Sequence, residues 1–283
     1  MVTVIIPTFN RSASLKRAIE SVRGQAFADW ELIVVDDGSE DDTGTMVAGF
    51  GDPRIRYVLT KHAGVSAARN CGIALARHPW ICFLDSDDYW MPLKLKRQAC
   101  ELEQDTRYSV IYTNEIWIRR GIRVNQKKIH QKYSGWIYER CLPLCIISPS
   151  SVLLHRDVLD TEGLFDENLP VCEDYELWLR IAARHPVRFL DEPLIVKTGG
   201  HADQLSHQFW GMDRFRVQAL IKTYGSGRLT QQEKRSTAAE IVRKAQILAA
   251  GFENRGKMEA AEEYRALVRQ WGERAQGASF LSP

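Results

Sequence analysis

The segment Trp80-Ile-Cys-Phe-Leu-Asp-Ser-Asp-Asp-Tyr-Trp90 contains an apolar run, 81–84, that ends abruptly at three carboxylates, Asp85, Asp87 and Asp88. A short apolar run with sharp boundaries is typical of a strand that is buried on both faces of a parallel sheet. In open α/β sheets, ligands bind just beyond the carboxyl ends of such strands. Carboxylates placed there can hold a hard cation such as Mg2+, or they can form a solvated turn that caps the next helix. This segment alone is compatible with a cation site and with a helix-capping turn.

Strands and helices alternate before this segment. Apolar β-branched runs predict strands at 2–6, 30–35 and 54–59, and helical spacing predicts helices at 12–24, 41–48 and 64–76. Ser12 or Ser14 is expected to cap the first helix, and Ser39 or Asp41 the second. This alternation predicts a parallel sheet with right-handed crossovers. Since Asp36 and Asp37 follow the second strand, they are expected at the same sheet edge as Asp85, which favours a binding site.

The rest of the chain continues with mixed elements and then becomes helical. Strands are predicted at 108–112, 151–154, 187–190 and 194–197, and helices at 92–103, 135–142, 156–161 and 173–184. The basic segment 117–133 is interpreted as a solvated loop or exposed hairpin rather than an anion site. From about residue 208 the composition is helical, with a helical hairpin around 254–256. We therefore expect a main domain at 1–205 and, packed on it, a helical extension at 206–283.

Composition excludes several classes of protein. The 283 residues include 38 basic and 36 acidic side chains, a net charge of +2, so no field for binding nucleic acid is expected. The six cysteines lack zinc-site spacing and are interpreted as reduced, buried thiols of a cytosolic protein. Neither a signal peptide nor an 18-residue apolar run is found. A cytoplasmic protein is predicted, with peripheral association at the inner face of the membrane left open.

Five motifs, in order, resemble one family. They are Val4-Ile-Ile-Pro-Thr-Phe-Asn10-Arg11, Trp30-Glu-Leu-Ile-Val-Val-Asp-Asp-Gly-Ser39, Gly64-Val-Ser-Ala-Ala-Arg-Asn70-Cys-Gly72, Phe83-Leu-Asp-Ser-Asp-Asp88 and Glu173-Asp174 with Leu177-Trp178-Leu-Arg180. Their order and spacing resemble the inverting family 2 glycosyltransferases over about residues 1–205. The resemblance implies the GT-A fold, an α/β Rossmann-like architecture with a mixed, mostly parallel sheet. The C-terminal helices lie outside it.

The resemblance also implies a donor-nucleotide site at the strand ends. Asp37 would accept a hydrogen bond from the uracil N–H, with Asp36 as the alternative. Arg69 would face the nucleotide or its diphosphate, since a guanidinium pairs well with phosphate. The full set implied for the donor nucleotide is Pro7, Thr8, Phe9, Asn10, Arg11, Asp36, Asp37, Arg69, Asp85 and Ser86.

A divalent metal, Mn2+ or Mg2+, and a general base complete the implied site. Asp87 is the expected metal ligand, while Asp85 serves the ribose or shares the metal. His201 is either a third ligand or a structural residue. Asp88 is expected to cap the helix near residue 92. In an inverting transfer a carboxylate takes the proton of the acceptor hydroxyl, and Asp174 is the expected base with Glu173 as the alternative.

Together these features predict a metal-dependent, inverting enzyme that moves a sugar from a nucleotide diphosphate-sugar, foremost a UDP-sugar, to a glycan or lipid-linked acceptor. The Gln-x-x-Arg-Trp element of processive family members is absent, so one sugar is expected per acceptor. The alternatives are a sugar-phosphate nucleotidyltransferase and a non-catalytic nucleotide-sugar binding module. The basic residues at 119–132 could favour an anionic lipid-phosphate acceptor or a membrane surface.

Overall fold

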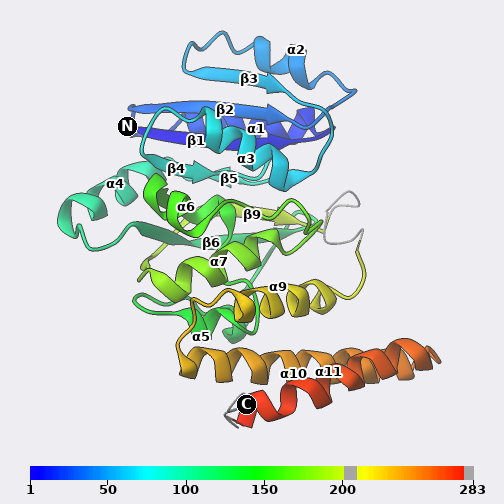
Figure 1. Cartoon of the computed structure of the whole chain (residues 1–283). Helices are drawn as coiled ribbons and strands as arrows, with labels where there is room; N and C mark the ends of the chain where they lie inside the picture. Colours follow the sequence, from blue (N-terminus) through cyan, green and yellow to red (C-terminus); the bar gives the residue numbers. More distant parts are fainter. Residues whose placement is uncertain (201–208, 277–283) are drawn as a thin grey trace.

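A computed structural model describes residues 1–200 and 209–276 of the chain (Figure 1). Within these residues, a nine-stranded mixed sheet has the strand order β3-β2-β1-β4-β8-β6-β9-β5, with β7 paired to β6. Helices cover both faces of the sheet, and a helical hairpin lies at the end of the molecule that is opposite β3 (Figure 1). The α/β fold class with a C-terminal helical extension is therefore confirmed.

The first half of the chain forms the predicted parallel sheet. The strands are β1 (Val2–Thr8), β2 (Trp30–Asp36), β3 (Ile55–Leu59) and β4 (Trp80–Phe83), and the helices are α1 (Ser12–Arg23), α2 (Thr43–Ala48) and α3 (Val65–Leu75). Thr8 pairs with Asp36, and Ile5 with Phe83. The acidic ends of β2 and β4 therefore flank the end of β1 at one edge of the sheet, as the sequence predicts.

The second half adds antiparallel strands. Its elements are β5 (Tyr89–Trp90), α4 (Lys94–Gln104), β6 (Val110–Arg119), β7 (Ile122–Val124), η1 (Lys128–His130), α5 (Tyr138–Cys141), η2 (Pro149–Ser151), β8 (Val152–His155), α6 (Arg156–Glu162), α7 (Glu173–Arg184) and β9 (Arg188–Gly199). The two strands predicted at 187–190 and 194–197 form the single strand β9. The β6–β9 pairing shifts register around Asn114, opposite Pro193, and this irregularity lets β9 continue past a proline that cannot donate a hydrogen bond.

Alternate residues of β1 enter two hydrophobic clusters, one on each face of the sheet. Ile5 joins Ala68 and Ile73 of α3, whereas Val4 joins Leu15 and Ile19 of α1. This alternation follows from the two-residue period of a strand. At Gly72, a Cβ atom would lie 2.4 Å from Ile5 Cγ2, so glycine permits the close packing of α3 on β1.

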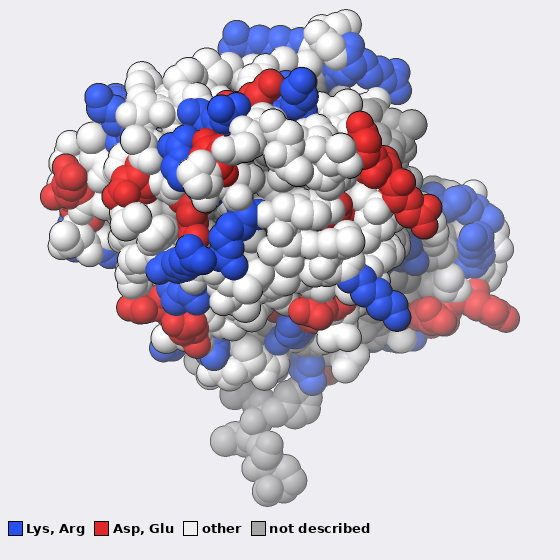
Figure 2. Space-filling view, turned by 90° about the horizontal axis from the view of Figure 1, so that it is seen from above, with Lys and Arg blue, Asp and Glu red and all other residues white. Residues whose placement is uncertain are grey.

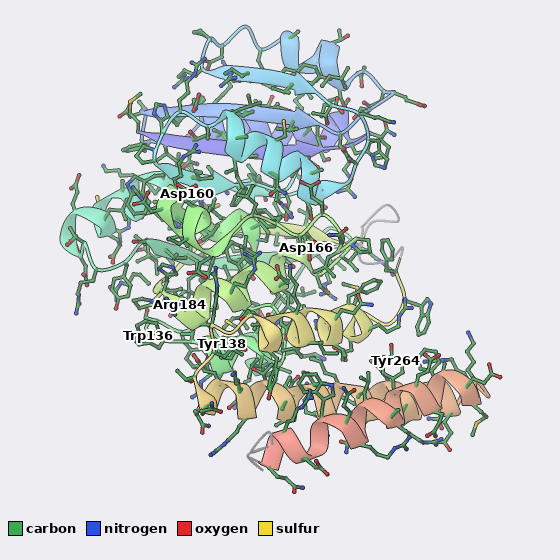
Figure 3. The ribbon with its side chains drawn as sticks, viewed as in Figure 1. Trp136, Tyr138, Asp160, Asp166, Arg184 and Tyr264 are labelled. Carbon is green, nitrogen blue, oxygen red and sulfur yellow. The ribbon has the colours of Figure 1, made fainter. Side chains whose placement is uncertain are left out.

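The extension contains α9 (Asp213–Gly225), α10 (Gln231–Glu253) and α11 (Met258–Gln276). Thr230 and Glu233 form a capping box that begins α10. Leu220 and Ile241 belong to the same hydrophobic cluster as the sheet. The Tyr138 hydroxyl of α5 lies 2.6 Å from Thr237 Oγ1 in α10, and Figure 3 shows Tyr138 beside these helices. The domain boundary at 205 stays a prediction.

Several local expectations are wrong. Helix α1 begins without a side-chain cap, because the Ser12 N–H donates to Asp41 Oδ2 from the neighbouring turn. Asp41 also accepts from the N–H of Thr43, the first residue of α2, although Asp42 rather than Ser39 or Asp41 occupies the N-cap position. The helix predicted at 135–142 is confined to Tyr138–Cys141.

The surface carries charges of both signs. Lys and Arg side chains and Asp and Glu side chains are interspersed with uncharged residues on the face seen from above (Figure 2). Among the described residues, no helix combines the length and the apolar character that a membrane span requires. All six cysteines are free thiols.

Candidate functional site

A cavity of about 770 Å³ lies at the acidic edge of the sheet. Seven residues of the predicted donor set line it: Pro7, Thr8, Phe9, Asn10, Arg11, Asp37 and Ser86. The start of α3, which belongs to the motif 64–72, also lines the cavity. The residues 62–63 and the segment 167–170 add lining that the sequence did not identify. Asn70, one of the motif residues, bonds Phe165 and Glu167 and so holds this last segment in place.

The two carboxylates after β2 have different surroundings. The Asp37 carboxylate lines the cavity and accepts hydrogen bonds from the Ala63 and Gly64 N–H groups, at 2.8 and 2.9 Å. Asp36 is fully buried and accepts from Tyr57 Oη at 2.6 Å and from the Ser39 N–H at 2.8 Å. Because a carboxylate offers about four acceptor positions, Asp37 can still accept a donor from a ligand. The geometry therefore favours Asp37 over its alternative.

An aromatic face borders the same cavity. The Phe9 ring stacks on His62, with ring centroids 4.2 Å apart and an interplanar angle of 23°. His62 Nδ1 lies 2.9 Å from Asp37 Oδ2, which orients the imidazole. A planar base could stack in this environment, and sequence reasoning had found Phe9 but not His62.

Arg69 has a different position from the one expected. Its side chain is buried, at 3% exposure, and it does not line the cavity. Nη1 lies 2.6 Å from Glu173 Oε1, and Nη2 lies 2.8 Å from Asp85 Oδ1. Burial disfavours the cation, yet the two carboxylates raise the pKa of Arg69 above its ordinary value. Arg69 thus connects the start of α7 to the end of β4.

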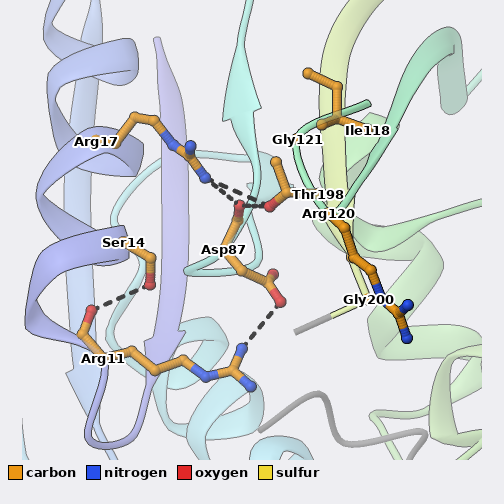
Figure 4. Close-up of a pocket in the computed structure, with 10 residues that line it drawn as sticks. Arg11, Ser14, Arg17, Asp87, Ile118, Arg120, Gly121, Thr198 and Gly200 are labelled. Carbon is orange, nitrogen blue, oxygen red and sulfur yellow. Dashed lines mark hydrogen bonds and ion pairs between the residues drawn. The ribbon is translucent and has the colours of Figure 1, made fainter. Parts of the chain in front are cut away.

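Asp87 and Asp88 diverge after β4. Asp87 Oδ2 lies 2.9 Å from Arg11 Nη1, and its side chain is partly exposed (Figure 4). Asp88 is buried and accepts hydrogen bonds from Ser150 Oγ at 2.7 Å and from the Thr198 N–H at 2.9 Å. Burial, with Asp87 and Asp85 nearby, raises the pKa of Asp88 well above its ordinary value. The prediction that Asp88 caps the next helix is wrong, because Asp88 joins β4 to β9 instead.

The two candidate bases at the start of α7 also differ. Burial raises the pKa of Glu173 to about 7, although its carboxylate is paired with Arg69. Asp174 is half-buried, and its Oδ2 accepts from Cys145 Sγ at 3.4 Å. Cys172 precedes them in a left-handed conformation, φ 62°, that turns the chain into the helix. Asp174 is therefore the more accessible carboxylate, while Glu173 holds Arg69.

Lys197 of β9 is a site residue that sequence reasoning missed. Burial disfavours its charge, but Glu115, Asp88, Asp85 and Asp174 raise the pKa of the Lys197 ammonium above its ordinary value. These four carboxylates come from β6, from the segment between β4 and β5 and from the start of α7, so the cation interacts with acids of three separate parts of the fold. The sequence signal that could have identified Lys197 is its position as the charged residue that ends the apolar run 194–196.

Lys132 was grouped with exposed basic residues, and that grouping is wrong. Its ammonium is buried, 3.3 Å from Glu115 Oε1, and donates to the Ile146 carbonyl at 2.6 Å. The predicted hairpin at 117–133 is otherwise present as β6 and β7. His201 lies outside the described residues. Within the described part of the chain, no group of three His, Cys, Asp or Glu side chains is arranged to hold a metal ion.

The fold and these motifs agree with the GT-A class of glycosyltransferases. The family model "Glycosyl transferase family 2" matches residues 3–161, more than half of the chain. The chain therefore belongs to glycosyltransferase family 2, and it is a glycosyltransferase.

Named relatives agree with this assignment. The uncharacterized glycosyltransferase RP339 of Rickettsia prowazekii is 30% identical over 73% of this chain and 66% of that protein. The Escherichia coli protein WfgD, a UDP-Glc:alpha-D-GlcNAc-diphosphoundecaprenol beta-1,3-glucosyltransferase, is 35% identical over 64% of this chain and 69% of its own length. The matches thus span about two thirds of each relative.

Solved structures share the fold. S. aureus TarS 1-349 in complex with UDP-GlcNAc aligns with a TM-score of 0.79 at 19% identity, over 97% of this chain and 81% of that one. The mannosyltransferase PcManGT of Pyrobaculum calidifontis, in complex with GDP-Man and Mn2+, aligns with a TM-score of 0.61 at 17% identity, over 96% and 84%. At these identities the likeness supports the GT-A fold.

Proposed function

We propose that this chain is a metal-dependent, inverting, non-processive glycosyltransferase that uses a UDP-sugar to glycosylate a glycan or lipid-linked acceptor in cell-surface polysaccharide synthesis. The observation that carries the proposal is the chain of contacts from Asp85 through Arg69 to Glu173. These contacts fix the start of α7, and with it the accessible Asp174, relative to the acidic end of β4. Membership of the family favours sugar transfer over nucleotidyl transfer.

A uridine nucleotide suits the larger cavity. Phe9 and His62 offer a stacked aromatic wall, and Asp37 can accept the imide N–H of uracil. The names of WfgD and of the TarS complex both specify UDP-sugars, which supports this choice of donor. The donor-binding role of the whole predicted set remains a proposal, and Arg69 and Asp36 would act by positioning other residues.

Asp174 is proposed as the general base. Its carboxylate would accept the proton of the acceptor hydroxyl while the hydroxyl oxygen attacks the anomeric carbon from the face opposite the diphosphate. This attack inverts the anomeric configuration.

The acidic strand end suits a divalent metal. Asp85 and Asp87 present hard oxygen ligands with side chains 25% and 18% exposed, and Mg2+ or Mn2+ fills its other positions with water and phosphate. Asp85 is paired with Arg69 and Asp87 with Arg11, so both carboxylates lie where a positive charge is favourable. When bound, the metal would act as a Lewis acid on the departing diphosphate. His201 stays a candidate third ligand.

The acceptor is proposed to be lipid-linked. The WfgD relative is named for a diphosphoundecaprenol-linked acceptor, a substrate that resides in a membrane. The proposal places the enzyme in the cytoplasm, in peripheral contact with the inner face of the membrane.

Calorimetry with UDP tests the donor site. We expect UDP to bind the intact protein more tightly with Mn2+ or Mg2+ than with EDTA, and Asp87→Ala to remove most of the gain from metal. The matched control is Asp160→Ala, a change on α6 away from the site (Figure 3). If UDP fails to bind, or binds Asp87→Ala and the intact protein equally in the presence of metal, the donor and metal assignments are wrong.

Asp174→Asn tests the base. Turnover of a UDP-sugar should fall by about 10²–10⁴-fold, the usual contribution of general base catalysis, with UDP affinity unchanged. Glu173→Gln serves as the comparison, because it should lower thermal stability through the loss of the Arg69 ion pair. If Asp174→Asn keeps its turnover, and Glu173→Gln is folded but loses turnover, the general base is Glu173 instead.

A further inference from the structure

A second cavity, of about 410 Å³, is lined by Asp87 and adjoins the nucleotide cavity at Arg11. Its polar side chains are Arg11, Ser14, Arg17, Asp87, Arg120 and Thr198, and they come from α1 and the residue before it, the β4–β5 loop, the β6–β7 turn and the end of β9 (Figure 4). Arg11 is shared with the nucleotide cavity, whereas Arg17 and Arg120 line the smaller cavity alone. The molecule therefore has two compartments at the acidic strand end.

The smaller cavity carries an excess of positive charge. Three guanidinium groups line it, but Asp87 is the single carboxylate in its lining among the described residues. Arg17 Nη2 donates to the Asp87 carbonyl at 2.8 Å and to Thr198 Oγ1 at 3.4 Å, which are neutral acceptors. Within residues 1–200 and 209–276, neither Arg17 nor Arg120 forms an ion pair with a carboxylate. Among the described residues, no carboxylate therefore compensates these two cations.

The backbone positions Arg120 at this cavity. Arg119 pairs with Ile122, so Arg120 and Gly121 form a two-residue hairpin turn with φ values of 50° and 77°. Positive φ at both central residues is the conformation that a tight hairpin needs, and arginine adopts it rarely. A basic side chain in this strained position, at the rim of a cavity with two further arginines, indicates binding of an anion.

Phosphate groups match this lining. Guanidinium groups form paired, charge-assisted hydrogen bonds with phosphate oxygens, and the lining of this cavity contains three of them. The volume exceeds what one phosphate needs and leaves room for a diphosphate. The cavity lies between α1 and the β4–β5 loop on one side and the end of β6, the β6–β7 turn and the end of β9 on the other. Because, among the described residues, it shares only Arg11 with the lining of the nucleotide cavity, its ligand is expected to be the second substrate.

We propose that the arginine-lined cavity binds the diphosphate group of a prenyl-linked acceptor while the donor occupies the nucleotide cavity. This inference rests on the proposed function, and it specifies the acceptor as a diphosphate-linked one. Such an acceptor would place its anionic group beside Asp87.

Titration of the UDP-loaded protein tests the inference. The intact protein is saturated with UDP in excess Mg2+, and inorganic pyrophosphate or geranyl diphosphate, equilibrated with the same Mg2+, is titrated in. We expect both to bind, and Arg120→Gln and Arg17→Gln each to weaken binding about tenfold, the loss of a charge-assisted hydrogen bond. Arg123→Gln is the matched control, since Arg123 is exposed on β7 of the same hairpin but does not line the cavity.

Any other result of this titration contradicts either the diphosphate-site inference or the proposed donor site. If UDP binds but neither diphosphate binds the loaded protein, or if Arg123→Gln weakens binding as much as Arg120→Gln, the inference fails while the proposed function stands. If Arg120→Gln weakens the binding of UDP as much as it weakens the binding of the diphosphates, the cavity binds the donor and the inference fails. Binding of pyrophosphate without geranyl diphosphate indicates a site for free anions. If UDP does not bind, the donor proposal fails, and the same variants are then compared on the unloaded protein.

Discussion

Lys94 provides a quantitative test of the structure beneath the acidic strand end. Its side chain, in the first turn of α4, is 0% exposed. Nζ lies 3.6 Å from Cys82 Sγ, 3.4 Å from the Val152 carbonyl and 3.7 Å from the centroid of the Trp90 ring. These partners are weak for an ammonium ion, and among the described residues no carboxylate forms an ion pair with it. Its charge is therefore poorly compensated in the folded state.

Burial lowers the pKa of Lys94 from 10.5 to about 8, and the Cys82 thiol only partly opposes this effect. Between these two values the unfolded chain binds more protons than the folded protein, so the stability that depends on this group rises with pH in that window. One pKa unit corresponds to about 1.4 kcal/mol, so the buried charge costs about 3 kcal/mol at pH 7 and about 2 kcal/mol at pH 9. Lys94→Met removes this dependence.

The assay is urea unfolding of the intact protein and of Lys94→Met at pH 7 and pH 9. The free energy of unfolding of the variant, relative to the intact protein, should fall by about 1 kcal/mol between the two pH values. The relative measurement cancels the thiols and phenols that titrate in the same range. Lys96→Met, an exposed change on the same helix, should show no such pH dependence. A difference that stays constant, or moves in the opposite direction, would refute the reasoning.

Two further changes test the packing of the site. Gly72→Ala should lower the free energy of unfolding by about 1–3 kcal/mol in urea, because its Cβ would lie 2.4 Å from Ile5 Cγ2. The control Gly225→Ala, which has open space around the new Cβ, should be neutral or stabilising, and equal losses in both would contradict the packing argument. Tyr57→Phe should cost about 1–2 kcal/mol by removing the hydrogen bond to Asp36, with UDP affinity unchanged. A large loss of UDP affinity would instead indicate that Asp36 contacts the nucleotide.

The sequence identified part of the donor cavity because strand ends are local features. An apolar run that stops at a carboxylate identifies a strand end, and parallel strands bring such ends to one edge. This reasoning placed Asp36 and Asp37 at the edge where the cavity lies, and the family resemblance added Phe9. It did not separate Asp37 from Asp36, because the partner of Asp36, Tyr57, lies on a different strand 21 residues away.

The sequence also could not show which charges are buried together. Lys132 belongs to a basic run and was expected in solvent, but the fold pairs it with Glu115. Lys197 ends an apolar strand, and its acidic neighbours come from positions as far away as Asp85. Burial of charge depends on long-range packing, which a local pattern does not contain.

The sequence by itself determined the alternation of strands and helices, the acidic end of β4 and the family. Periodicity, strand ends and motif order are properties of short segments, and they remain visible in one dimension. Only the tertiary structure decided how the three carboxylates after β4 are used. Asp85 is held by Arg69, Asp87 faces the arginine-lined cavity, and Asp88 is buried against β9. The physical reason is that each partner comes from a separate element, and folding alone brings these elements together.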